Sequence, residues 1–376
     1  MGISQNNCCW LMPDIRDRVD ILEDQIPREF LEILLIDRTT GKNILWATDI
    51  GGHNEHDSIQ IEDIVGENGL VLRPRVKKSD EEKRLRTKKR AEVFTPSWVC
   101  NEQLNAADSL WFFGSAAPSS GSPFNSPVMG KRWKVTDDDI LRKTFEETGK
   151  SWEQYVLDDR IEMCCGEGPY LTSRYDVVTE RIIPLKQRIG ILDRKLRVVN
   201  TFVGVDSRAS KKEWADWIVK AYKHTYGFEW QGDNLVLTRE ALLYTLIDNL
   251  KAYNLNKLIK NNKGSIRTLL NKIEELDFDG LYLEDYEYIK SVCRIISWNF
   301  WQMDGLTACP PYTKPSIKLN ALVAAINKPK TTDLFGNVIP IEIPQEYCKL
   351  MDWDENIVTT YVEVYASAIK DESHEC

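Results

Sequence analysis

The sequence predicts an α/β protein built on a mostly parallel, doubly wound sheet. An alternating apolar run in residues 160–165 leads directly into Gly166-Glu167-Gly168-Pro169, as a buried strand leads into a tight turn. Farther along, residues 211–224 have the spacing of a packed helix, and residues 225–229 form a short strand that ends in Glu229. A strand, a Gly-rich turn, a helix and a second strand ending in an acid follow one another in doubly wound proteins that bind nucleosides.

The composition is that of a globular protein. Of 376 residues, 42% are apolar and 28% are charged, with a net charge of −9, so we expect a sizeable core and two or three structural units. No apolar run is long enough to span a bilayer, and residues 1–13 lack the pattern of a signal peptide. We therefore expect a cytoplasmic protein without membrane contact. Nine cysteines without Cys-x-x-Cys spacing and only four histidines argue for reduced thiols and against a metal site.

The first unit is expected to cover residues 1–90. Residues 28–36 pass into a polar turn and then into residues 43–47, an apolar run of strand length. The unit ends in a basic tract, residues 73–90, with ten Lys or Arg residues against three acids. Such a tract is either the solvated face of a helix or, on an acidic chain, a strip that contacts nucleic-acid phosphates.

The segment that follows the basic tract carries a helix signal. Thr95 or Ser97 can cap a helix that begins near Pro96, because proline fits the first helical turn. The segment is then either a capped surface helix or, through Phe94-Thr95-Pro96, one wall of a cofactor pocket. Residues 114–128 are rich in Gly, Ser and Pro and predict a linker, after which residues 136–157 return to helical spacing.

Two features of the central part suit a nucleoside cofactor. Gly166 and Gly168 lack the Cβ atom that would keep a ligand away from the backbone, and glycine tolerates positive φ. Glu229 ends the second strand, where a carboxylate can accept hydrogen bonds from both hydroxyls of a ribose. The turn after Glu229 leads into an amphipathic helix predicted for residues 238–252.

Three segments together resemble a known family. AEVFTP at 91–96, IEMCCGEGPY at 161–170 and YGFEWQGDNLVLTREALL at 226–243 look like successive motifs of S-adenosylmethionine-dependent, adenine-specific DNA methyltransferases of restriction-modification systems. The phrases GEGPYLTSRYD, IGILDRK and IISWNFWQMDG resemble modification subunits of restriction enzymes. The resemblance covers about residues 34–353. It implies a Rossmann-like methyltransferase fold with an N-terminal extension, a central domain over residues 91–325 and a C-terminal appendage over residues 326–376.

The resemblance also implies a site and an activity. The residues that would bind S-adenosylmethionine are Phe94, Thr95, Pro96, Gly166, Glu167, Gly168 and Glu229. The first three would lie near the methionine end of the cofactor, the glycines would allow its close approach, and the acid would hold the ribose. The implied activity is methylation of the exocyclic amino group of adenine in double-stranded DNA, with a second restriction-modification subunit as a further partner.

Two departures from the family pattern matter. Residues 171–225 separate the Gly-rich turn from Glu229, where about twenty residues are usual, and within them residues 181–205 look basic and strand-like. This insertion either carries DNA contacts or extends the sheet. The catalytic Asn-Pro-Pro-Tyr or Asp-Pro-Pro-Tyr is absent. That motif accepts hydrogen bonds from the adenine amino group, so that its lone pair faces the methyl, and stacks an aromatic ring on the flipped base.

Three segments could replace the missing motif. Asn299 lies among aromatic residues, Cys309-Pro310-Pro311-Tyr312 retains Pro-Pro-Tyr, and Asp352-Trp353 pairs an acid with an aromatic ring. We favour Asn299 as the catalytic residue, although its neighbours also have the spacing of a core helix. One alternative is a cofactor-binding or DNA-binding subunit that needs a partner chain for the motif. A nicotinamide-dependent dehydrogenase is less favoured, because Leu171 stands where the third glycine of its motif would be.

Overall fold

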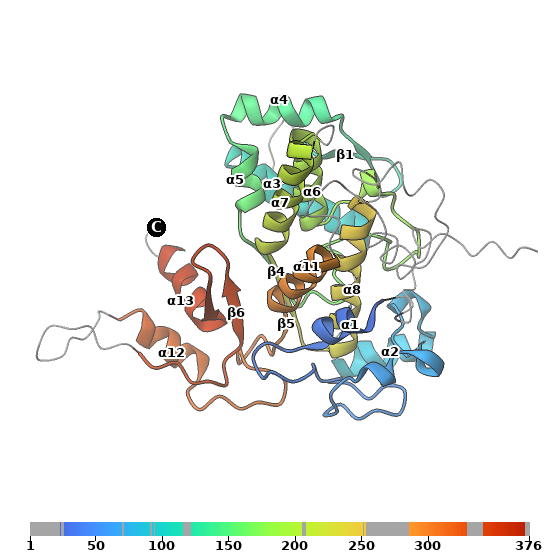
Figure 1. The fold of residues 1–376 in the computed structure, drawn as a ribbon, viewed down its shortest axis with the longest axis vertical. Helices are drawn as coiled ribbons and strands as arrows, with labels where there is room; N and C mark the ends of the chain where they lie inside the picture. Colours follow the sequence, from blue (N-terminus) through green and yellow to red (C-terminus); the bar gives the residue numbers. More distant parts are fainter. Residues whose placement is uncertain are drawn as a thin grey trace, which may run out of the picture.

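A small parallel sheet lies at the centre of the protein (Figure 1). It consists of β3 (Arg160–Met163), β4 (Thr225–Glu229) and β5 (Phe300–Gln302), in the order β3-β4-β5. Neighbouring strands are parallel. The protein is therefore of mixed α/β class, as the sequence predicts. The computed structural model describes residues 23, 26–69, 71–90, 92–93, 95–115, 122–204, 208–250, 252, 286–328 and 341–372.

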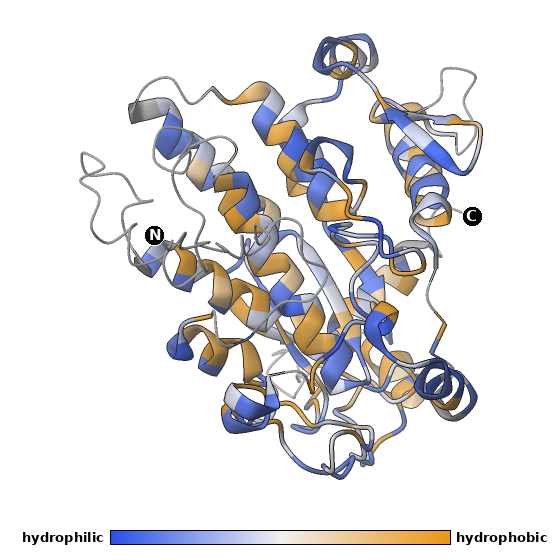
Figure 2. Ribbon diagram, turned by 90° about the vertical axis from the view of Figure 1, so that its right-hand side faces the viewer, coloured by the Kyte–Doolittle hydropathy of each residue, from blue (hydrophilic) through white to orange (hydrophobic). Residues whose placement is uncertain are grey.

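Helices that connect the strands form the main core on one face of the sheet. The connection from β3 to β4 contains α6 (Ile191–Phe202) and α7 (Arg208–Lys223), and the connection from β4 to β5 contains α8 (Gly232–Asn249) and α11 (Tyr286–Asn299). Their apolar side chains form one buried cluster that includes Phe300 of β5. In Figure 2 the orange, apolar segments gather along the helices in the middle of the molecule.

On the opposite face of the sheet, a C-terminal unit covers β4 and β5. This unit consists of α12 (Leu319–Ile326), the antiparallel pair β6 (Lys349–Asp352) and β7 (Ile357–Thr360), and α13 (Tyr361–Glu372). Its apolar residues form a second cluster with Tyr226, Phe228 and Trp301 of β4 and β5. In Figure 1 the unit lies at the lower left, and its strand β6 contacts the connecting helix α11.

The N-terminal part packs into the main core. Helix α1 (Arg28–Leu35) lies against α11, and its buried residues belong to the same apolar cluster as the connecting helices. Arg239 of α8 fastens this arrangement, because its buried guanidinium donates to the carbonyls of Phe300 (2.9 Å) and Ile36 (2.9 Å). Burial lowers the pKa of Arg239 to about 9. The core thus runs across the unit boundary that we place at residue 90.

The remaining elements surround the core. They are the 3₁₀ turns η3 (Ile61–Asp63), η4 (Gly66–Asn68), η5 (Arg75–Lys77) and η6 (Leu185–Gln187), the helices α2 (Asp80–Arg90), α3 (Ser97–Phe113), α4 (Asp138–Thr148) and α5 (Trp152–Leu157), and the hairpin of β1 (Asn125–Val128) and β2 (Arg132–Val135). Residues 125–128 of the predicted linker are thus a strand.

Two local predictions are wrong, each for a physical reason. Residues 181–205 are not a strand-like insertion but contain α6, whose start is fixed by Asp193, since this carboxylate accepts from the amides of Gly190 (3.0 Å) and Ser173 (2.7 Å). The helix near Pro96 does begin there, but no side-chain hydroxyl caps it. Instead the Ser97 amide donates to Asp176 (2.8 Å), a distant carboxylate that takes the role of the cap.

Neither a membrane span nor a metal cluster is found in the described part of the chain. No helix among the described residues is both long and apolar enough to cross a membrane. Over the same residues, no group of three or more His, Cys, Asp or Glu side chains has the arrangement of a metal site.

Candidate functional site

A cavity of about 610 Å³ lies at the carboxyl edge of the sheet, above the ends of β3 and β4. Ligands of open α/β sheets bind outside this edge, where the loops after parallel strands converge. The residues that line the cavity are Lys88, Glu92, Val93, Thr95, Glu162, Cys164, Cys165, Gly166, Pro169, Tyr170, Glu229, Trp230, Gln231 and Asn234. The structure therefore brings Thr95, Gly166 and Glu229 together, although they lie far apart in the sequence.

The Gly-rich turn has the backbone conformation that requires glycine. Gly166 has φ = 56° and Gly168 has φ = 75°, values that side chains with a Cβ rarely adopt. Thr238 of α8 donates to the carbonyl of Gly166 (2.6 Å), and a Cβ on Gly168 would lie 3.2 Å from the Thr238 methyl group. Gly168 thus serves the packing of the turn on α8, whereas Gly166 lines the cavity.

Glu167 points away from the cavity. Its buried carboxylate accepts from the Arg75 amide (2.5 Å) and from the Tyr175 hydroxyl (2.9 Å), and burial raises its pKa. Its side chain therefore ties the turn to the segment before α2. Glu167, predicted to be a cofactor-binding residue, therefore does not line the cavity.

Glu229 is the carboxylate at the centre of the site. One oxygen accepts from the Gly166 amide (2.9 Å) and the other from the Gln231 amide (3.1 Å). Burial raises its pKa to about 7. Each carboxylate oxygen can accept more than one hydrogen bond, so both retain capacity for a ligand hydroxyl.

Two further acids lie near Glu229. Glu162 lines the cavity, and burial raises its pKa to about 7. Asp304 comes two residues after β5, and its charge, with those of Glu229 and Glu162, adds to the burial that raises the pKa of Cys164. Asp304 is not among the predicted site residues, although it follows a strand-like run as Glu229 does.

Gln231 is a second cavity residue that is not among the predicted site residues. It is 4% exposed and lines the cavity, yet its Oε1 has no hydrogen-bond partner among the described residues. A buried acceptor without a donor is costly, so such an atom points to a ligand that supplies the donor. The half-buried indole of Trp230 lies beside it and meets Tyr312 edge to face, with ring centroids 5.3 Å apart.

The wall opposite the glycine turn comes from the segment before α3. Thr95 lines the cavity together with Glu92 and Val93, and Pro96 is the residue that precedes the helix. Phe94, predicted for the same wall, lies outside the described residues. Pro96 does not line the cavity but sets the direction of the chain at its rim.

The basic tract of residues 73–90 is mostly engaged in ion pairs within the protein. Arg86 binds both Glu92 and Asp233, and Lys78 lies 3.1 Å from Asp233. These four side chains are buried and fasten α2 to the first turn of α8, beside the cavity. Arg73, Arg75, Lys77 and Lys83 are also paired with carboxylates. The tract is therefore chiefly a structural clamp.

Asn299 does not reach the cavity. It lies at the amino edge of the sheet, fully buried, where its amide donates to the carbonyls of Tyr222 (3.0 Å), Lys223 (2.8 Å) and Thr225 (3.1 Å). Its oxygen accepts from the Trp353 indole (2.7 Å). The prediction that Asn299 is catalytic is corrected on this geometry, since the carboxamide is saturated and on the wrong side of the sheet.

The other two segments that could replace the missing motif lie at opposite ends of the central strands. Asp352 accepts from the amides of Asp354 and Glu355 (both 3.0 Å) and so closes the turn between β6 and β7. The segment with Cys309 and Tyr312 lies nearer the cavity, because Tyr312 packs on Trp230. Cys309 itself is buried.

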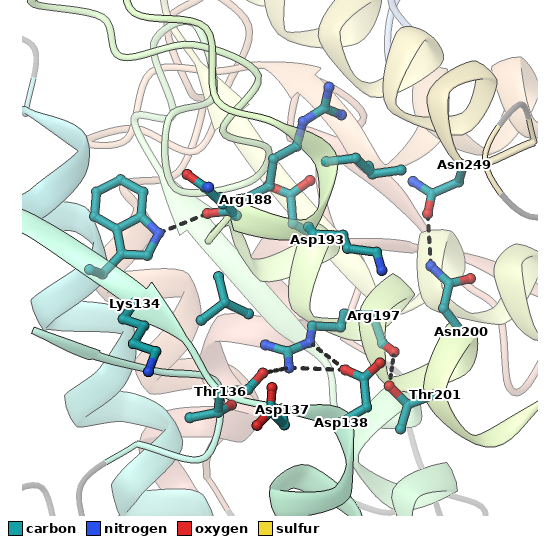
Figure 3. Close-up of a pocket in the computed structure, with 15 residues that line it drawn as sticks. Lys134, Thr136, Asp137, Asp138, Arg188, Asp193, Arg197, Asn200, Thr201 and Asn249 are labelled. Atoms are coloured by element: carbon teal, nitrogen blue, oxygen red, sulfur yellow. Dashed lines mark hydrogen bonds and ion pairs between the residues drawn. The ribbon is translucent and has the colours of Figure 1, made fainter.

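A second cavity, of about 450 Å³, is bounded by β2, η6 and α6 (Figure 3). Arg197 donates to the Thr136 carbonyl (2.6 Å) and pairs with Asp138 (3.0 Å), while Asn200 donates to Asn249 (2.9 Å). Arg188 Nη1 and Asp193 Oδ1, from two other residues that line this cavity, have no hydrogen-bond partner among the described residues. The cavity contains none of the predicted site residues, and we assign it no ligand.

Comparison of the chain with protein-family models, with curated proteins and with solved structures gives no match. The site is therefore interpreted from its own geometry.

Proposed function

We propose that the cavity at the carboxyl edge binds the nucleoside part of S-adenosylmethionine, and that the chain is the cofactor-binding part of an adenine-specific DNA methyltransferase. The observation that carries the proposal is Glu229, a carboxylate at the end of β4 that bonds to the amide of Gly166 in the glycine turn after β3. A strand-end acid beside such a turn is the arrangement by which doubly wound proteins hold a ribose.

The sheet supports this proposal. Strands β3, β4 and β5 are parallel and joined by helical connections, as in one half of a Rossmann-like doubly wound sheet, and the Gly-rich turn follows the first of the three. In that fold the nucleoside lies over the carboxyl ends of the first two strands, which is where the cavity of about 610 Å³ opens.

The residues of the cavity suit the chemical parts of the cofactor. The Glu229 carboxylate would accept hydrogen bonds from the ribose hydroxyls, and the orphaned Oε1 of Gln231 would accept from a further ligand donor. The indole of Trp230 offers an apolar face to a purine. Glu162 adds a carboxylate to the same cavity, which suits a sulfonium cation. When bound, S-adenosylmethionine supplies the methyl group.

Transfer of that methyl group needs a hydrogen-bond acceptor for the adenine amino group. The sequence lacks Asn-Pro-Pro-Tyr, and Asn299 lies at the opposite edge of the sheet. This placement favours the alternative in which a partner chain, such as a second restriction-modification subunit, supplies the acceptor. The chain would then contribute cofactor binding, and double-stranded DNA would bind across both chains.

Calorimetry on the purified chain tests the proposal. S-adenosylmethionine and S-adenosylhomocysteine should bind with one site per chain, because they share the nucleoside that the cavity is proposed to hold. NAD should not bind comparably, since Leu171 stands in place of the third glycine of the dinucleotide motif. Binding of NAD but of neither sulfur compound would replace the proposal with a dehydrogenase.

A further inference from the structure

The two outer strands of the central sheet, β3 and β5, have different surroundings. At β5, the Gln302 side chain bonds to both the amide and the carbonyl of Leu45 (2.8 Å each), so the N-terminal segment is held against this strand. At β3, the only strand neighbour within the described residues is β4. The Arg160 amide points to β4, where it donates to the His224 carbonyl (3.3 Å). By alternation, the backbone groups of Ile161 and Met163 point to the other side, and no described residue bonds to them.

The side chains next to this edge are apolar and uncovered. Ile161 and Met163 pair in register with Tyr226 and Phe228, so they share the face on which the C-terminal unit packs. That unit buries the β4 side chains but leaves Ile161 43% and Met163 64% exposed. A groove of about 220 Å³ runs between Ile161 and Val364 of α13. An exposed apolar strand at a free edge is a site for pairing with another chain.

The handedness of the connections indicates where the helices of any strand added beside β3 would lie. The crossovers through α6–α7 and α8–α11 lead away from β3 and cover one face of the sheet. Connections between parallel strands are right-handed, so strands added on the free side of β3 must place their helices on the opposite face. That is the face on which Ile161 and Met163 are exposed.

We infer that the β3 edge and the groove beside α13 form a docking surface for a second polypeptide, which adds a parallel strand to β3 and lays its following helix over Ile161 and Met163. The partner completes a sheet of which this chain holds one half. This inference rests on the proposed function, under which the loop after the partner's strand would supply the missing acceptor. That loop would lie next to Cys164, at the rim of the cofactor cavity, where the acceptor is needed.

The acidic residues around the groove indicate the charge that the partner should carry. Asp159 and Asp354 flank His224 at the amino end of β3, with side chains 62% and 74% exposed. A parallel strand enters at this end, so we expect basic residues just before it in the partner. A second copy of this chain is a poorer occupant, because two-fold related β3 strands would pair antiparallel and leave the sheet without its second half.

The test uses the full chain and a defined probe. The probe is the product of a reading frame flanking this gene that carries Asn-Pro-Pro-Tyr or Asp-Pro-Pro-Tyr after an apolar strand. Both chains are co-expressed, and the mass of the purified complex is measured by light scattering. The wild type should give a 1:1 complex that Met163→Lys abolishes. The control is Met129→Lys, the same change at a methionine 94% exposed in the β1–β2 hairpin, and it should leave the complex intact.

Three results would overturn the inference: a wild-type chain that forms no complex with the probe, a complex that Met163→Lys does not weaken, and a wild-type homodimer that Met163→Lys dissociates. Binding of S-adenosylmethionine to each variant is measured in parallel. Because Met163 does not line the cofactor cavity, Met163→Lys should bind the cofactor as the wild type does. A complex without cofactor binding would refute the proposed function and leave the docking surface standing.

Discussion

Replacement of Glu229 by glutamine is the perturbation that probes the site most sharply. Glutamine retains the size of the side chain but removes its charge, and its amide group would face the amide of either Gly166 or Gln231, each now a donor to the carboxylate. A hydrogen bond to a charged group contributes about 1.5–3 kcal/mol. We therefore expect the Kd for S-adenosylmethionine to rise on the order of 10- to 100-fold.

The raised pKa of Glu229 adds a dependence on pH. With a pKa of about 7, the ionised fraction falls about tenfold between pH 8 and pH 6, so cofactor affinity should strengthen as the pH rises through 7. The stability of the folded protein should instead decrease as the pH rises through 7. A carboxyl group whose pKa is raised in the folded protein contributes stability below its ordinary pKa of 4.5, and this contribution is lost as the pH rises through 7.

Titration calorimetry at pH 6, 7 and 8 measures how the Kd for S-adenosylmethionine depends on pH and on the Glu229→Gln substitution. The matched control is Glu162→Gln, since Glu162 lines the same cavity and burial also raises its pKa to about 7. The loss of affinity in Glu162→Gln measures the general attraction between a carboxylate and a cationic ligand. Any greater loss of affinity in Glu229→Gln measures the contribution of the ribose contacts. Equal Kd values for the wild type and Glu229→Gln, with both proteins folded, would refute the assignment of Glu229.

Three other predictions concern the clamp, the amino edge and DNA. Arg86→Ala removes the cation that Glu92 and Asp233 share, although Arg75 and Lys78 remain as partners, and should lower the free energy of unfolding by about 1.5–3 kcal/mol in denaturant titrations. Arg84→Ala, on the exposed side of the same helix, should not shift the midpoint. Equal effects would contradict the clamp. Asn299→Ala should cost roughly 1–3 kcal/mol of stability and leave cofactor affinity unchanged; lost affinity at full stability would contradict its structural role. If α2 still contacts DNA, Arg84→Ala with Lys88→Ala should reduce the slope of log K against log salt by about 1–2 for any duplex, and an unchanged slope would exclude this contact.

The sequence predicted the strands and the turn of the site better than it predicted which side chains contact one another. The period of apolar residues and the positions of glycine are local signals, and they placed β4 at Thr225–Glu229 and the glycine turn after β3. The amphipathic helix predicted to begin at residue 238 begins instead at Gly232, because Asp233 in its first turn is held by Lys78 and Arg86. That contact spans more than 140 residues and leaves no periodic trace.

The errors share this origin. Asn299 among aromatic residues fits a stacking site as well as a core helix, and only the positions of the Tyr222, Lys223 and Thr225 carbonyls decide between them. The basic tract looks like a free cationic strip because the carboxylates that neutralise it lie elsewhere in the chain. Gln231 lies within the segment 226–243 that resembles a family motif, but nothing in the sequence singles it out, because its unpartnered oxygen is visible only once the cavity is formed.

A crystal structure of the chain with S-adenosylhomocysteine is the most direct test of the central claim. The nucleoside should lie over the carboxyl ends of β3 and β4, with ribose hydroxyls within hydrogen-bond distance of the Glu229 carboxylate and a ligand donor at Gln231 Oε1. Ligand density in another cavity, or a ribose without contact to Glu229, would contradict the account.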